Sequence, residues 1–363
     1  MKFTFKPSPN YRQPQSTQSI MFELTLGLLV VFGFSVGYYA MAYNISYALR
    51  ALGLLAVSVV CALATEAIWC KVLKLNVKDH MQSSFPWVTA IILTLMCRID
   101  ISYYALGVST IMAIFFGKLV FGGFGQNIFN PAAVGRSIIF ASFTGNVAAD
   151  LISSATPTTA IAGNGWLLAI PDGISSVCAT ATSCSAALIP APTFVELLTG
   201  TYAGALGETS TLLILAVGAY LAWREVIDWR VPVTYLGTLF VLATVYGLVF
   251  NQGMAYGLYH ILLGGAAFGA VFMMTDPVTN PTSAAGRVVF AMGCAIFTLL
   301  IRVKANLPEG VLYSILLMNL MTPAIEKLMD GNQIKTEKKN WTIIAIVAVV
   351  GVAATLICAF ANM

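Results

Sequence analysis

Charged residues are scarce in this chain: they make up 9% of its 363 residues, against about 25% in typical soluble domains. Hydrophobic residues make up 58%, and the mean hydropathy is +0.84. The basic residues are scattered and form no basic face, which excludes a nucleic-acid-binding protein. Apolar runs near or above about 18 residues recur from end to end, and each can cross the hydrocarbon core as a helix. The sequence therefore predicts an all-α, polytopic membrane protein.

Histidine and paired cysteines are also scarce. The chain has two histidines and seven cysteines, with no CxxC and no Cys/His pairing, so its spacing supports no zinc or cluster site, and we expect no metal ligands. Only Cys178 and Cys184 lie in a polar region. They could form a disulfide outside the membrane or remain two free thiols.

Lysine and arginine are absent between Arg136 and Arg224. Elsewhere they gather in the N-terminal tail and near residues 71–78, 224–230 and 327–339. By the positive-inside rule these clusters are cytoplasmic and the segment 150–209 is extracytoplasmic. The first 20 residues lack an early apolar core and a small-residue cleavage site, so we expect a cytoplasmic N-terminus before a retained first span. The predicted location is the cell (inner) membrane of a prokaryote.

We expect ten to eleven transmembrane helices, of which the third (85–99) is short and the fifth (132–149) is interrupted. Either of these two could be tilted or span half of the bilayer. The candidate spans are 20–42, 46–69, 85–99, 102–121, 132–149, 210–223, 233–250, 255–274, 287–301, 309–328 and 341–361. They divide the chain into a tail (1–19), a first bundle (20–149), an extracytoplasmic loop (150–209), a second bundle (210–328), a linker (329–340) and an additional helix (341–363).

The stretch "GGFGQNIFNPAAVGR", residues 122–136, lies at membrane depth. Its glycines and Pro131 would break a helix, and Gln126, Asn127 and Asn130 offer amide donors and acceptors. Unwound backbone within a membrane is tolerated only where it lines a cavity or is buried in protein. Two interpretations stay open: a tight turn between helices with polar caps, or a cofactor or ion site.

The stretch "MMTDPVTNPTSAAGR", residues 273–287, follows a wholly apolar span. Asp276 lies near the membrane boundary, where an ionisable residue is a functional candidate. It could take part in cation coupling, or it could be an ordinary polar cap of a helix that Pro277 and Pro281 end.

Three glutamates lie in or beside the apolar runs. Glu66 lies about one turn from Lys71, and we expect a snorkelling ion pair between them. The same interpretation applies to Glu23, just inside the first span, and to Glu326 beside Lys327.

The segment "DLISSATPTTA", residues 150–160, is rich in hydroxyl groups. No His, Lys or Arg lies in the surrounding loop to activate a hydroxyl, which argues against Ser-His catalysis. We therefore expect no catalytic residue. A threonine beside a carboxylate on an accessible loop is a plausible acceptor in group transfer.

Asp150-Leu-Ile-Ser153-Ser154-Ala155-Thr156 resembles the acceptor motif D-x-x-[S/T]-[G/S]-A-T, in which a flavin transferase links the phosphate of FMN to the final threonine. The chain also carries "SPNYRQPQSTQSIM", "TDPVT" and "PEGVLYSILLMNLMTPAIE". Together, up to about residue 330, these resemble the D subunit of Rnf-type electron transport complexes. The resemblance to the B subunit of the sodium-pumping NADH:quinone reductase is weaker.

This resemblance implies a flavin-carrying membrane subunit of a redox-driven pump that passes electrons between ferredoxin and NAD, coupled to Na⁺ or H⁺ movement. Thr156 would carry covalent FMN, with Asp150, Ser153, Ser154 and Ala155 as the recognition pattern. In relatives a second flavin, riboflavin, lies inside the membrane part. Gln126, Asn127 and Asn130 would line it or contact the first flavin. The implied partners are the other proteins of the Rnf complex, notably the second FMN-bearing protein (the G subunit) and the iron–sulfur subunits, and the flavin transferase during maturation.

A second copy of the motif, "DGISSVCATAT" at 172–182, fails at two positions. Val177 replaces the small alanine and Cys178 replaces the threonine, whose hydroxyl the phosphoester needs. A function of a different class also stays open: a secondary transporter whose broken helices at 122–131 and 274–281 form a substrate site.

Overall fold

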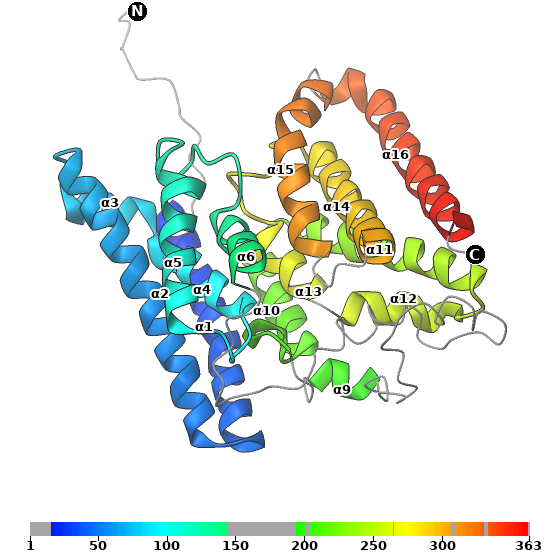
Figure 1. The fold of residues 1–363 in the computed structure, drawn as a ribbon. Coiled ribbons are helices and arrows are strands. Elements are labelled where there is room, and N and C mark those ends of the chain that lie inside the picture. The colour runs from blue at the N-terminus through cyan, green and yellow to red at the C-terminus, as the bar shows by residue number, and fades with distance from the viewer. Residues whose placement is uncertain are drawn as a thin grey trace, which may run out of the picture.

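The computed structural model describes residues 16–143, 194–199, 204–263, 265–305, 310–329 and 333–361, and every regular element in these ranges is a helix (Figure 1). Within these ranges, six helices are long and apolar enough to cross a membrane. They are α1 (Thr17–Ala42), α2 (Ile45–Val72), α11 (Arg230–Val249), α14 (Ala284–Ala305), α15 (Gly310–Met329) and α16 (Gln333–Ala361). The all-α, multi-pass membrane class predicted from the sequence is confirmed.

The number of full-length spans is smaller than expected in the part of the chain that the structure describes. A bent pair, α12 (Gly253–Leu262) with α13 (Ala266–Phe268) and the π-helix η3 (Gly269–Met273), adds a seventh span if counted as one. Four expected spans are shorter helices: α4 (Pro86–Met96), α5 (Tyr103–Ile114) with the π-helix η1 (Phe115–Leu119), α6 (Pro131–Ser142) and α10 (Thr211–Trp223). Hydropathy finds an apolar run but not the proline or polar turn that cuts it short.

The smaller elements connect these helices. α3 (Val77–Ser84) follows α2, α9 (Phe194–Thr199) precedes α10, and the 3₁₀ turn η2 (Leu206–Glu208) packs against α4. Polar side chains begin many of the helices: Ser16 accepts a hydrogen bond from Ser19 N, Ser102 from Ala105 N and Ser210 from Leu213 N. These caps satisfy backbone N–H groups that have no partner within the helix.

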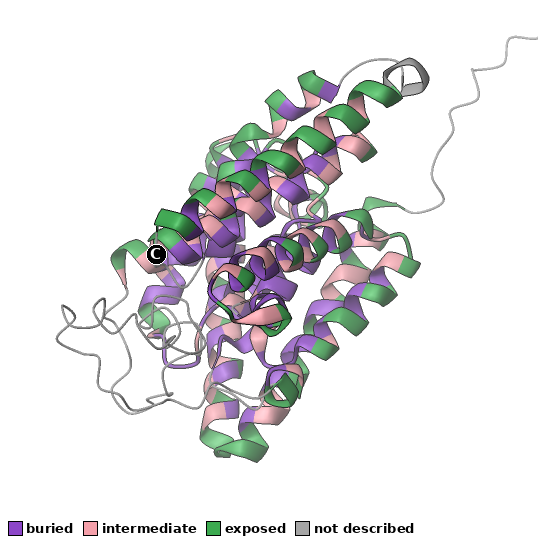
Figure 2. Ribbon diagram, turned by 90° about the vertical axis from the view of Figure 1, so that its right-hand side faces the viewer, coloured by how far each residue is buried: buried purple, intermediate pink, exposed green. Residues whose placement is uncertain are grey.

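The buried side chains form a core in the middle of the bundle, and exposed residues follow the outer faces of the long helices (Figure 2). Many of the exposed residues are large and apolar, among them Phe22, Leu49, Val60 and Val349. An exterior of this kind is suited to lipid. The C-terminal half and the N-terminal half lie side by side in Figure 1, with α6, α10 and α13 between them.

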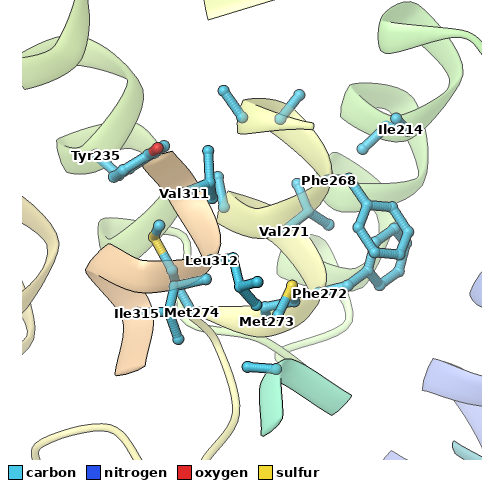
Figure 3. Packing of buried hydrophobic residues seen from close by; sticks show 14 of the residues in the cluster. Ile214, Tyr235, Phe268, Val271, Phe272, Met273, Met274, Val311, Leu312 and Ile315 are labelled. Carbon is cyan, nitrogen blue, oxygen red and sulfur yellow. The ribbon is translucent and has the colours of Figure 1, made fainter. Parts of the chain in front are cut away.

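The π-helix η3 lies at the centre of this core. Phe268, Val271 and Phe272 pack in one cluster with Val311, Leu312 and Ile315 of α15, with Tyr235 of α11 and with Ile214 of α10 (Figure 3). All five residues of η3 are buried. The unwound segment that follows η3 therefore begins deep inside the protein.

Candidate functional site

Two unwound segments, residues 120–130 and 274–283, each follow a π-helix and lead to an Asn-Pro pair. The first pair is Asn130-Pro131 at the start of α6, and the second is Asn280-Pro281 shortly before α14. Each pair is followed by Gly-Arg, at 135–136 and at 286–287. The similarity of "NPAAVGR" to "NPTSAAGR" is visible in the sequence. The equivalent places of the two stretches in the fold were not predicted from it. Short π-helical segments such as η1 and η3 are frequent at functional sites.

Glycine permits the backbone of the first segment. Gly122, Gly123 and Gly125 have φ angles of +114°, +99° and +91°, a region that side chains with a Cβ rarely enter. At Gly122 a Cβ would also lie 2.0 Å from Oε1 of Gln126. The expected break of the helix at these glycines is therefore present.

Both asparagines bond to carbonyls at the end of η3. Nδ2 of Asn130 donates to the carbonyl of Met273 (3.3 Å), and Nδ2 of Asn280 donates to the carbonyl of Met274 (2.7 Å). Oδ1 of Asn130 meanwhile accepts from Ala132 N (3.0 Å), which caps α6. Asn130 thus links the N-terminal half to the C-terminal half, and it satisfies a carbonyl that the end of η3 leaves without a helical partner.

A cavity of about 70 Å³ lies where the two segments meet. Its wall is mainly apolar on the side of α1 and α4 and mainly polar on the side of the two segments. The polar lining residues are Ser84, Thr89, Lys118, Asn127, Asn130, Thr275 and Asp276, and the aromatic ones are Phe124 and Phe272. Asn127 and Asn130, two of the predicted site residues, are buried in this wall. Gln126 is exposed and does not line the cavity.

Asp276 caps a turn and also lines the cavity. Its Oδ1 accepts from Val278 N (3.2 Å) and its Oδ2 accepts from the hydroxyl of Thr279 (3.3 Å), so the carboxylate caps the turn. The same residue lines the cavity together with Lys118. A carboxylate and an ammonium on one cavity wall can hold a polar ligand that carries both donors and acceptors.

Lys118 is a charged residue that sequence reasoning missed. It lies on η1, its side chain is 3% exposed, and its Nζ is 2.8 Å from Oε1 of Glu66, which is fully buried. Ser84 donates to the same oxygen (2.7 Å) and accepts from Lys118 Nζ through its backbone carbonyl. The signal was present in "FFGKLV", a lysine within an otherwise apolar run.

The expected ion pair between Glu66 and Lys71 was wrong, because Glu66 pairs with Lys118. Side chains on a helix face each other at spacings of three and four residues, whereas Glu66 and Lys71 are five apart. The sequence placed Glu66 correctly on a helix but could not show which distant cation would face it. His80 also approaches Glu66, with Nε2 3.9 Å from Oε2.

Other acids make long-range contacts too. Glu23 pairs with Arg224 (2.7 Å), which joins α1 to the end of α10, and Oε1 of Glu326 accepts from Thr282 N (3.1 Å). Asp228, in the loop before α11, pairs with Arg287 (2.6 Å). Burial raises the pKa of Asp228, but the hydrogen bonds and positive charges of Arg287 and Arg230 together outweigh it and hold the pKa below its ordinary value. Asp228 therefore stays ionised and fixes the start of α14 near the start of α11.

The proposed flavin acceptor motif lies outside the described residues. This applies to Asp150, Ser153, Ser154, Ala155 and Thr156, and to Cys178 and Cys184. The geometry around the cavity therefore bears on the expected site residues Asn127 and Asn130 and not on the motif.

Comparison with known proteins identifies the family. A family model described as "NQR2, RnfD, RnfE family" matches residues 4–335. The D subunit of a proton-translocating ferredoxin:NAD⁺ oxidoreductase complex of Clostridium ljungdahlii is 32% identical over 93% of this chain and 97% of its own length. The D subunit of a Na⁺-translocating ferredoxin:NAD⁺ oxidoreductase complex of Acetobacterium woodii is 33% identical, over 90% and 93%. The D subunit of an ion-translocating oxidoreductase complex of Halorhodospira halophila is 31% identical, over 88% and 91%. The chain is a member of the NQR2, RnfD, RnfE family.

Proposed function

We propose that this chain is the D subunit of an ion-translocating ferredoxin:NAD⁺ oxidoreductase complex and carries flavins across its membrane part. The observation that carries the proposal is the similarity to the D subunits of such complexes over almost the whole of both chains. The other proteins of the complex, including an FMN-bearing G subunit and iron–sulfur subunits, are its partners. The transporter alternative has weaker support, because the relatives that match almost the whole chain are named as subunits of oxidoreductase complexes.

The first proposed flavin is FMN joined by a phosphoester to Thr156. Two independent features of the sequence support it: the acceptor motif at 150–156, and the lack of basic residues from 137 to 223 that predicts an extracytoplasmic loop. The N-terminus would then lie in the cytoplasm. The loop holds no cation that could activate Thr156, so a flavin transferase must supply the chemistry of attachment.

The second proposed flavin, riboflavin, occupies the cavity between the two unwound segments. The lining suits a flavin in kind: Phe124 and Phe272 offer apolar surface for a flat ring, and Lys118, Asn127 and Asp276 offer polar groups for its edge. The cavity of about 70 Å³ must widen to admit the ring. When bound, the flavin supplies one- and two-electron transfer, while the protein supplies position and electrostatics. The paired charges of Lys118 and Glu66 add a fixed dipole beside the site.

The Asn127→Leu variant should lose the non-covalent flavin but keep the covalent one, because only the cavity loses a polar group. The matched control is Gln126→Leu, an exposed neighbour on the same segment. Flavin released by acid from the purified protein measures the non-covalent fraction, and we expect it to fall about tenfold or more in Asn127→Leu, as for the loss of one well-made polar contact. Equal release from both variants and the parent would place riboflavin elsewhere.

The Asp276→Asn variant separates charge from capping, since asparagine keeps an oxygen that can accept from Val278 N. If the carboxylate takes part in ion coupling, ferredoxin-dependent ion transport in vesicles should slow about tenfold, which corresponds to about 1.4 kcal/mol in the barrier. The amount of folded protein and bound flavin should not change. An unaltered transport rate would leave Asp276 with only its role as the cap of this turn.

A further inference from the structure

The last helix, α16, lies almost wholly beyond residue 335, where the family match ends. It packs against α14 and α11 at the edge of the bundle (Figure 1). All three helices begin at the same end of the protein, because Arg230, Ala284 and Glu337 line one cavity. The feature of interest is the groove that runs between these helices.

The groove consists of two cavities on successive helical turns. The first, of about 400 Å³, is lined by the starts of the three helices, and the second, of about 210 Å³, follows one turn further along α14 and α16. From Arg230 to Leu242 along α11 the groove is about 18 Å long, at 1.5 Å per residue. One leaflet of a bilayer has about 15 Å of hydrocarbon. The groove therefore has the length of one lipid headgroup and its acyl chain.

The chemistry changes along the groove as it does along a phospholipid. The inner part is lined by glycine and apolar residues, including Gly237, Val241, Ile296 and Gly351. The mouth contains Arg230 and Trp341, and the exposed Lys338 and Lys339 lie on the same turns of α16. Glu337 is the acid that lines this mouth among the described residues.

Two polar groups at the mouth suit a phosphate and a hydroxyl. The guanidinium of Arg230 is 46% exposed and lies 3.9 Å from Asp228, whose Oδ2 already accepts from Arg287 at 2.6 Å. Its charge is therefore available to an anion. Oδ1 of Asn340 is buried and receives no hydrogen bond from the described residues, a state that costs free energy unless a donor is supplied. Trp229, next to Arg230 in the chain, and Trp341, next to Asn340, are both exposed. Exposed tryptophans are typical of a membrane interface.

We propose that the groove between α11, α14 and α16 binds one phosphatidylglycerol molecule. Its phosphate lies at Arg230, a headgroup hydroxyl donates to Oδ1 of Asn340, and one acyl chain follows Gly237 toward Gly351. The lipid joins α16 to the bundle. This assignment does not depend on the flavins or on the proposed redox function.

The test fills the groove without disturbing the packing. A Cβ at Gly237 would meet no atom within 4 Å, so Gly237→Leu extends into open space. Gly33 on α1 has the same property and is also exposed, which makes Gly33→Leu the matched control. The complex is purified in mild detergent from membranes containing phosphatidylglycerol and phosphatidylethanolamine, and retained lipid is counted by native mass spectrometry.

The parent and Gly33→Leu should retain one phosphatidylglycerol per chain, and Gly237→Leu should lose it about tenfold or more. Arg230→Gln should abolish the preference for phosphatidylglycerol over phosphatidylethanolamine. Equal lipid retention in both leucine variants overturns the site. Loss of another subunit from Gly237→Leu, with lipid unchanged, would assign the groove to a protein partner and also overturn the proposal.

Discussion

Replacing Thr156 with alanine should remove all covalently bound flavin from the chain. A phosphoester needs a hydroxyl oxygen, and the motif at 150–156 ends in the hydroxyl of this residue. The measurement is the yellow fluorescence of the denatured chain on a gel under ultraviolet light, after expression with a flavin transferase. Thr158→Ala, two residues further on, is the matched control and should keep the signal. Undiminished fluorescence in Thr156→Ala would move the attachment to another residue.

The second copy of the motif allows a gain-of-function version of the same prediction. In the Thr156→Ala background, Val177→Ala together with Cys178→Thr completes the pattern that begins at Asp172. If the transferase reads only the local sequence, these two changes should restore covalent fluorescence. Val177→Ala without Cys178→Thr should not restore it, because no hydroxyl stands at the last position.

The second large effect is expected at the buried ion pair beside the cavity. Glu66→Gln keeps an oxygen that can accept from Ser84 and Lys118 but removes the negative charge. Lys118 would then be a buried cation without a compensating charge, which destabilises a folded protein by about 3–5 kcal/mol. We expect a clear drop in the thermal unfolding midpoint of the detergent-purified protein.

Two further variants test this reason for the drop. Glu66→Leu combined with Lys118→Met replaces both charges by apolar groups and should recover most of the lost stability. Glu23→Gln breaks an exposed pair with Arg224 and should leave the midpoint nearly unchanged. A double variant as unstable as Glu66→Gln would mean that the charges themselves are not the cause.

The sequence predicted the parts of the fold that depend on local patterns. The long apolar helices, the break at Gly122–Gly125 and the polar character of Asn127 and Asn130 all follow from composition and from residues with special backbone preferences. The role of Asp276 as a cap also follows from its neighbours along the chain. These features depend on the residues nearby in the chain and not on contacts with distant segments.

The features that the sequence did not predict depend on contacts between distant segments. Glu66 faces Lys118, which is 52 residues away, and Asn130 donates to a carbonyl 143 residues away. Neither partner can be read from spacing, because each depends on how elements far apart in the chain pack together. The helices α4 and α6 correspond to the spans 85–99 and 132–149, which were expected to be short and interrupted. The helices α5 and α10 were counted as full spans, because hydropathy measures apolar content and not the helix length that packing leaves.

The attachment of FMN to Thr156 is the central claim, and peptide mapping tests it most directly. Trypsin leaves both motif copies on one peptide, since no Lys or Arg lies between Arg136 and Arg224. Cleavage before aspartate separates them, into residues 150–171 and 172–227. Tandem mass spectrometry of these two peptides from the native complex should find FMN, less one water, on Thr156 of the first peptide only. Unmodified Thr156 in protein that fluoresces, or FMN on the second peptide, would contradict the account.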